Sequence, residues 1–283
     1  MFAINRTTIR ETYEDETRIH TLRVDPDHLA FITEAESFLE KNSPLPVTFD
    51  VACCQNPYFS EFTYSDFSEA FWVKSLSNEF NTRYFLQLPK HLEGELRFSE
   101  KYDLALNLSE TKDRKILFLA GTNLWDKHAW EIIDRLMYFN DKALIKTHPL
   151  TQDESLQELG RRYGWHRVLA PFDSGYGWYE RAAEVYSTAN SELMVRSLLD
   201  GKFKDCLTRI KDLGSCGYMP FFMLHKEGFT AEEIKSTILA PNSGIVFRWQ
   251  SDWQDRLKQY LQDALQFRKD FIPHTPVYMG HLQ

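Results

Sequence analysis

The run Lys115-Ile-Leu-Phe-Leu-Ala120 is almost continuously apolar, and Gly121-Thr122-Asn123 connects it to a segment, 129–138, that we expect to be helical. Short, continuously apolar runs are typical of strands that helices cover on both faces. This stretch therefore predicts one strand–turn–helix unit of a parallel sheet.

The same alternation continues beyond this unit. Further strands and helices are expected in turn at 142–147, 153–163, 167–170, 184–187 and 192–199. Gly164 and Gly201 follow the two helices, as glycine commonly does where a helix ends. The rhythm from 111 to about 203 predicts a doubly wound α/β sheet.

Residues 1–110 also alternate between strand and helix patterns. Pro26 suits the first turn of a helix, and Asn42-Ser43-Pro44 ends it. The other expected elements are a strand pair within 2–24, a strand at 47–54, a helix from about 65 to 80, and strands at 84–88 and 102–108. They predict an α/β layer in this part of the chain.

The polar segment 109–113 is the expected boundary between two domains, 1–110 and 111–283. The second domain ends in a long helix. Ser251 and Gln254 have the spacing of a capping box that opens this helix, which we expect to run to Phe267.

Composition restricts the class of protein. The chain has 283 residues, 43% of them hydrophobic, which is enough to bury a core. Its four cysteines, Cys53, Cys54, Cys206 and Cys216, are too few for a disulfide scaffold and include no CxxC pair. No signal-peptide core and no run of ~20 apolar residues is present. We therefore expect a soluble protein of the cytoplasm with no membrane span.

The net charge of −8 weakens any general attraction to nucleic acid. The excess lies in residues 1–110, which carry 10 basic and 19 acidic side chains, whereas residues 111–283 carry 23 and 22. The second domain can therefore supply cations to a diphosphate. Binding of DNA would need a local basic groove, for which Arg6, Arg10, Arg18 and Arg23 are candidates.

Polar residues follow three of the expected strands, and ligands of open parallel sheets bind at the carboxyl ends of strands. Gly121 and Thr122 follow the first strand, but a full dinucleotide or Walker motif is missing, so this turn is either a phosphate cradle or a simple connection. His148 follows the second, with Lys146 on the same side of the strand. It donates either to a phosphate oxygen or to a backbone carbonyl.

Ser187-Thr188-Ala189-Asn190-Ser191-Glu192 follows the last of these strands and leads into a helix. The free N–H groups and positive dipole end of a helix N-terminus favour an anionic ligand. The alternative is that Asn190 or Ser191 only caps the helix.

As an ordered set, these motifs resemble the donor-binding domain of GT-B glycosyltransferases. The resemblance is greatest to bacterial capsule-type and sialyltransferase-like enzymes and to the related polyol-phosphate transferases. The set covers roughly residues 114–203 and consists of Lys146-Thr-His148-Pro149, Ala183-Glu-Val-Tyr-Ser187-Thr188, Asn190-Ser191-Glu192 and Leu199-Asp-Gly201-Lys202.

The resemblance implies an α/β fold of two Rossmann-like domains, with a nucleotide sugar bound in the cleft between them. His148 would then contact the diphosphate, and Ser187, Thr188 and Ser191 would bind phosphate from the strand end and the helix cap. Further candidates for donor binding are Gly121, Thr122, Lys146 and Asn190. Glu192 would accept from ribose or sugar hydroxyls. Enzymes of this kind need no bound metal or cofactor, because cations and protein dipoles stabilise the leaving diphosphate.

An inverting transfer also needs a base for the acceptor hydroxyl. Asp50, Asp66 and Glu69 are the candidates. Asp50 lies in an apolar strand, where a carboxylate is either partnered or functional. Asp66 and Glu69 have the alternative role of a helix N-cap and capping box. A retaining mechanism would not need such a base.

Two further choices stay open. The aromatic segment Tyr176-Gly177-Trp178-Tyr179 is either a mobile loop that stacks on a base or sugar ring or a loop anchored by its aromatics. The acceptor hydroxyl belongs either to a glycan or to a (glucosyl-)hydroxymethylated base in phage DNA, which places the protein in a bacterium or a phage-infected host. A CDP-polyol phosphotransferase and a non-catalytic nucleotide-binding module are the alternative functions.

Overall fold

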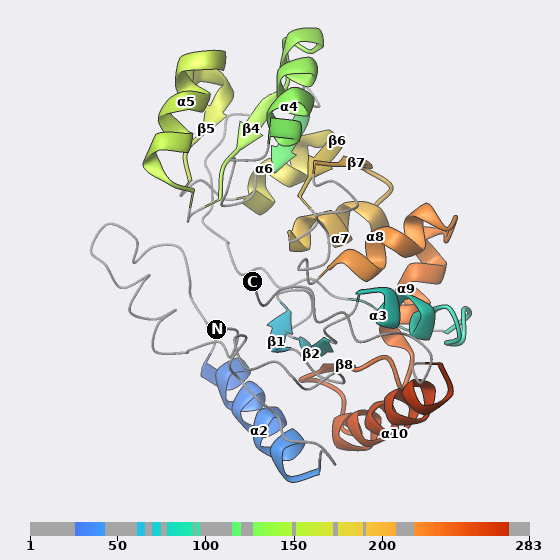
Figure 1. Cartoon of the computed structure of the whole chain (residues 1–283). Helices are drawn as coiled ribbons and strands as arrows, with labels where there is room; N and C mark the ends of the chain where they lie inside the picture. The colour runs from blue at the N-terminus through green and yellow to red at the C-terminus, as the bar shows by residue number, and fades with distance from the viewer. Residues whose placement is uncertain are drawn as a thin grey trace, which may run out of the picture.

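The protein is described here by a computed structural model, shown in Figure 1. The described residues are 26–42, 61–65, 70–74, 78–92, 94, 96, 115–119, 127–148, 151–171, 175–188, 191–207 and 218–271. They form one parallel and one antiparallel sheet, and helices pack against both. None of the described helices is long and apolar enough to cross a membrane.

The larger sheet has five strands in the order β5-β4-β3-β6-β7, and all its pairs are parallel. Its strands are β3 (Lys115–Leu119), β4 (Leu144–Lys146), β5 (Val168–Leu169), β6 (Ala182–Ser187) and β7 (Phe203–Cys206). The chain first adds strands on one side of β3 and then crosses to the other side. The strand order therefore reverses between β3 and β6, as it does in doubly wound α/β sheets.

Helices cover both faces of this sheet. Helices α4 (Lys127–Phe139) and α5 (Asp153–Tyr163) share a core with Ile145 and Val168 on one face. Helices α6 (Gly175–Arg181) and α7 (Glu192–Leu199) share a core with Leu144 and Leu169 on the other. Neighbouring strand residues point to opposite faces, which explains why the strands are apolar without alternation.

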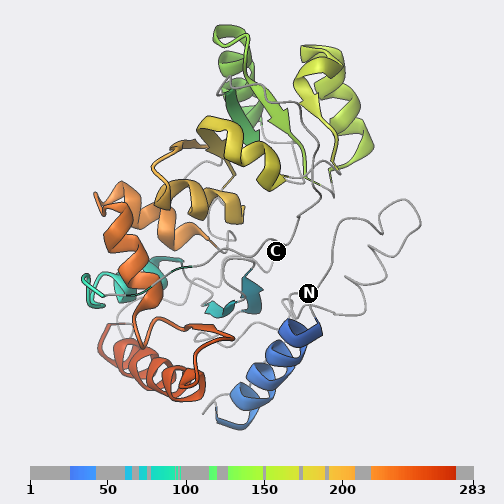
Figure 2. The ribbon, with the colours of Figure 1, turned by 180° about the vertical axis from the view of Figure 1, so that it is seen from behind.

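The smaller sheet has the order β1-β2-β8 and is antiparallel throughout. Its strands are β1 (Glu61–Ser65), β2 (Ala70–Lys74) and β8 (Ile245–Phe247). The helices in this part of the molecule are α2 (Pro26–Asn42), α3 (Asn78–Phe85), α8 (Met219–Lys226), α9 (Ala231–Leu239) and α10 (Trp253–Phe271). Seen from behind in Figure 2, α2 and α10 lie at the end of the molecule opposite to α4 and α5.

One large core joins segments that are far apart in the chain. It contains Phe71 and Trp72 of β2, Phe247 of β8 and Tyr260 of α10, together with Met194 of α7. Because β8 pairs with β2, residues after 240 complete the sheet that residues before 75 begin. The division into domains 1–110 and 111–283 stays a prediction. So does a Rossmann-like fold for residues 1–110, whose described strands, β1 and β2, are antiparallel.

Several expected elements are confirmed. Helix α2 spans Pro26–Asn42, and α5 spans Asp153–Tyr163 with Gly164 at a positive φ of 82° after it. The expected strands at 115–120, 142–147, 167–170 and 184–187 correspond to β3, β4, β5 and β6. The final helix begins at Trp253, later than the Ser251 capping box predicts, and continues to Phe271. The expected strands at 2–24, 47–54 and 102–108 lie outside the described residues.

Two expectations in the first half of the chain are wrong. The helix expected from 65 to 80 is interrupted by strand β2, whose residues 70–73 are fully buried in the middle of the antiparallel sheet. A short apolar run does not reveal by its periodicity whether it is helix or strand. The strand expected at 84–88 instead contains the last two residues of α3 and the turn that follows. The Tyr84 hydroxyl donates there to the Asn242 carbonyl (2.5 Å).

Candidate functional site

The carboxyl edge of the parallel sheet, where its five strands end, brings two predicted site residues into one row. Leu169, Lys146, Leu119, Ser187 and Cys206 are paired in register across the strands. Lys146 and Ser187 lie on either side of β3, two strand spacings or roughly 10 Å apart. Their side chains share the face covered by α6 and α7, because Leu144 and Val185, two residues earlier, belong to the core on that face. The row crosses the reversal point between β3 and β6.

Lys146 is buried, and its ammonium group donates to two backbone carbonyls. One belongs to Thr147 and the other, at 3.0 Å, to Pro171. The bond to Pro171 links the end of β4 to the connection after β5. The neighbouring Thr147 hydroxyl adds a second link, because it donates to the carbonyl of Leu169 in β5 at 3.1 Å. Lys146 therefore stabilises the connections at this edge and also places an ammonium group there.

Two of the connections from strand to helix at this edge, β4 to α5 and β6 to α7, contain the same kind of backbone hydrogen bond. The N–H of Thr151 donates to the carbonyl of His148 (2.9 Å), and the N–H of Ser191 donates to the carbonyl of Thr188 (3.2 Å). A bond between residues three apart is the pattern of a β-turn and holds the two Cα atoms within about 7 Å. His148 is thus fixed next to Thr151, and Thr188 next to Ser191.

The helices that follow these connections are not capped by side chains. Gln152 is the N-cap of α5 and Ser191 that of α7, and neither makes a side-chain cap hydrogen bond. In α9, by contrast, Thr230 and Glu233 form a reciprocal capping box. The first N–H groups of a helix have no intrahelical partner and carry its positive dipole end. At the carboxyl edge the side chains of Gln152 and Ser191 do not bond to these donors.

The remaining predicted donor-binding residues differ in accessibility. His148 is exposed, and Thr188 and Ser191 are half-buried. Ser187 is fully buried, and its hydroxyl donates to the Thr188 carbonyl (3.1 Å). The structure therefore places Lys146, His148, Ser187, Thr188 and Ser191 at one edge of one sheet.

Other predicted site residues are not placed by the structure. Glu192 is the first residue of α7, but its side chain is not described. The others lie outside the described residues; they are Asp50, Asp66, Glu69, Gly121, Thr122 and Asn190. Among the described residues, no group of three His, Cys, Asp or Glu side chains could hold a metal ion.

The aromatic segment expected at 176–179 belongs to helix α6 and is anchored. Tyr179 is fully buried, and its hydroxyl donates to the Asp200 carboxylate (2.5 Å). Burial and this hydrogen bond raise the pKa of Tyr179 far above its usual value. The Lys202 ammonium lies 4.4 Å from the ring centroid and donates to the Tyr179 carbonyl. Tyr179 therefore cannot be part of a mobile stacking loop.

The amino edge of the same sheet, where the strands begin, depends on a residue that the sequence did not single out. The Arg167 guanidinium donates to the carbonyls of Met137 (3.0 Å), Ala143 (3.1 Å) and Asn140. These carbonyls lie in the last turn of α4 and in the connection to β4. The negative end of the helix dipole also favours a cation at this position. Burial lowers the pKa of Arg167 from its usual value.

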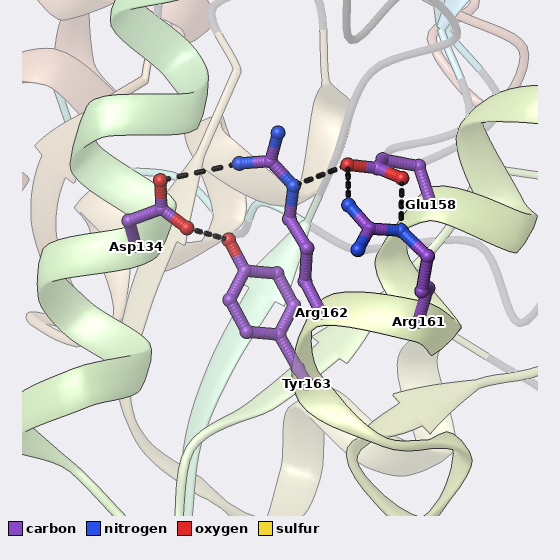
Figure 3. A network of polar contacts seen from close by, with 5 residues as sticks. All are labelled: Asp134, Glu158, Arg161, Arg162 and Tyr163. Atoms are coloured by element: carbon purple, nitrogen blue, oxygen red, sulfur yellow. Dashed lines mark hydrogen bonds and ion pairs between the residues drawn. The ribbon is translucent and has the colours of Figure 1, made fainter.

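A polar network on the outer surface joins α4 to α5 (Figure 3). Asp134 of α4 accepts from the Tyr163 hydroxyl (2.5 Å) and from Arg162 (3.3 Å). Glu158 accepts from Arg161 and Arg162 at 2.6–2.8 Å, and these bonds lower its pKa to about 2. The carboxylates of this network are paired within the protein, so the network holds the two helices together and is not a ligand site.

Comparisons of the chain with protein-family models, with curated proteins and with solved structures found no match.

Proposed function

We propose that the protein is a glycosyltransferase that uses a nucleotide-sugar donor and binds the donor's diphosphate at the carboxyl edge of the parallel sheet. The observation that supports this most is the row Lys146–Leu119–Ser187 at the reversal point, with two uncapped helix N-termini behind it. Such points are where doubly wound sheets bind nucleotides, and uncapped N-termini favour phosphate. The transfer reaction is proposed from the ordered motifs that resemble GT-B enzymes.

In this proposal the exposed His148 imidazole donates to a diphosphate oxygen, and the hydroxyls of Thr188 and Ser191 donate from the other side of β3. Lys146 positions the connections around the site and does not itself donate to the ligand, because its ammonium is bonded to backbone carbonyls. Ser187 also contributes through position, because its buried hydroxyl already donates to Thr188. Preorganised donors of this kind stabilise the charge that develops on the leaving group.

The transfer itself breaks the bond between the anomeric carbon of the sugar and the phosphate oxygen that carries it in the donor, and forms a bond from that carbon to the acceptor oxygen. The nucleoside diphosphate, or CMP from a CMP-sugar, leaves with the electron pair of the broken bond. In an inverting transfer the acceptor proton passes to a base of the protein. Asp50, Asp66 and Glu69 remain the proposed candidates for that base.

The experiment is a turnover assay with UDP-, GDP- and CMP-sugars. We expect one of these donors to be hydrolysed or transferred, and His148→Ala to reduce turnover by about 100-fold or more while the protein stays folded. His166→Ala is the matched control, since His166 is also an exposed histidine but stands beside β5 at the amino edge. Absence of binding and turnover with every donor would contradict the proposal. Binding without turnover would instead identify a nucleotide-binding module.

The dependence of acceptor binding on salt concentration distinguishes the two acceptor classes. If hydroxymethylated DNA is the acceptor, the affinity of the protein for DNA should fall steeply as the salt concentration rises, because contacts to phosphates release counterions. Transfer to a neutral glycan should depend little on salt. A CDP-polyol phosphotransferase would release CMP and leave the polyol phosphate on the acceptor.

A further inference from the structure

One hydroxyl at the carboxyl edge is buried and makes no hydrogen bond to any residue that the structure describes. The side-chain oxygen of Thr151 has no partner among the described residues, and the residue is only 6% exposed. Buried polar atoms in native proteins nearly always have a partner, because losing water without replacing its hydrogen bonds is unfavourable. An exception of this kind needs an explanation, and a bound ligand is one.

The position of Thr151 points to the kind of ligand. Its backbone N–H holds the carbonyl of His148 (2.9 Å), and the next residue, Gln152, is the uncapped N-cap of the eleven-residue helix α5. The Thr151 hydroxyl, the first N–H groups of α5 and the His148 imidazole are all donors. Asp153 and Glu154 in the first turn are exposed to water, which screens their charge.

We propose that Thr151 is a further ligand-binding residue whose hydroxyl donates to a phosphate oxygen of the bound nucleotide, alongside the N–H groups of α5. This inference rests on the proposed function and names a new residue within that site. Bound phosphate would accept a hydrogen bond from the Thr151 hydroxyl, which has no partner among the described residues. It would also accept from the first N–H groups of α5.

The chain contains a matched control four residues away. Thr147 is also buried, but its hydroxyl donates to the Leu169 carbonyl at 3.1 Å. Replacing Thr147 by valine leaves that carbonyl without its donor and should lower the melting temperature. Replacing Thr151 by valine removes a hydroxyl that bonds to none of the described residues, so the melting temperature should stay the same or rise.

The test measures melting temperature and calorimetric affinity for UDP, GDP, CDP and CMP in the wild type, Thr151→Val, Thr151→Ser and Thr147→Val. For the nucleotide that binds, we expect Thr151→Val to weaken binding about tenfold, which matches the loss of one hydrogen bond to a charged group. Thr151→Ser should bind like the wild type. The matching nucleoside without phosphate should bind both proteins equally.

Unchanged nucleotide affinity in Thr151→Val would overturn this inference while leaving the proposed function intact. A fall in its melting temperature as large as that of Thr147→Val would also overturn it, because it would show that the hydroxyl has a partner in the protein. If the wild type binds none of the four nucleotides, both the inference and the proposed function fail.

Discussion

The two edges of the parallel sheet satisfy their hydrogen bonds in different ways. At the amino edge, Arg167 donates to three backbone carbonyls around the end of α4. At the carboxyl edge, α5 and α7 begin without side-chain caps, and the Thr151 hydroxyl has no partner among the described residues. Lys146 and Thr147 also brace the carboxyl edge, so the difference lies in the helix starts and in Thr151. It is the difference expected if, as proposed above, the carboxyl edge keeps donors for a ligand.

Helix α9, which lies outside the carboxyl edge, begins with a complete capping box. Thr230 accepts from the Glu233 N–H (3.2 Å), and the Glu233 carboxylate accepts from the Thr230 N–H (2.9 Å). Helix α8 has no side-chain cap either, but Pro220 in its first turn removes one of the donors that a cap would satisfy. Ser191 is a good capping residue by type, and yet it makes no cap bond at the carboxyl edge.

The largest expected effect is at the amino edge. Arg167→Met should lower the free energy of unfolding by about 3 kcal/mol, because it leaves three carbonyls without their charged donor. Urea denaturation measures this change, and Arg161→Met, which removes an arginine 71% exposed on α5, is the control. Where Arg167→Met is still folded, its nucleotide affinity should equal that of the wild type. A loss of affinity without a loss of stability would reverse the roles assigned to the two edges.

A pair of cap variants compares α7 with α9 directly. Thr230→Ala should destabilise the protein by about 1 kcal/mol, because it removes a capping box. Ser191→Ala should change the free energy of unfolding by only a few tenths of the effect of Thr230→Ala, because the Ser191 side chain makes no cap bond. It should, however, weaken nucleotide binding about tenfold. Equal destabilisation by the two variants, measured by thermal and urea unfolding, would show that Ser191 is an ordinary cap.

The smallest expected effect concerns the network of Figure 3. The pKa of Glu158 is lowered in the folded protein from 4.5 to about 2, so its stabilising contribution is present above about pH 4.5 and is lost as the pH falls toward about 2. Glu158→Gln should therefore be slightly less stable than the wild type at pH 6, and the difference should vanish near pH 2. A constant difference across this range would mean that the ion pairs do not contribute. The pair is exposed, so the effect is small and sensitive to salt.

The sequence predicted the parallel sheet better than the antiparallel one for a physical reason. Helix α5 has an acidic first turn, a basic last turn and Gly164 after it, so its limits are local information. Strand β2 is recognisable only through its partners, β1 and β8, and β8 lies about 170 residues further along the chain. Its residues 70–73 are buried on both faces, which removes the alternation that would have marked a strand.

The candidate site was likewise predictable only in part. The sequence placed Lys146, His148 and Ser187 at strand ends because apolar runs stop there. It did not show that the Lys146 ammonium is bonded to the Pro171 carbonyl, or that the Thr151 hydroxyl is buried without a partner. Both depend on how two connections pack against each other. The nearest local signal was Pro149, since proline after His148 favours a turn that ends at Thr151.

The most direct test of the difference between the edges is amide hydrogen exchange, followed by NMR with and without a nucleoside diphosphate. We expect the bound nucleotide to slow exchange at the first amides of α5 and α7, residues 153–155 and 192–193. The amide of Arg167 at the amino edge, which donates to the Gly164 carbonyl (3.0 Å), should exchange at the same rate in both states. Protection confined to the amino edge, or no protection at either helix while the nucleotide is bound, would contradict a phosphate site at the carboxyl edge.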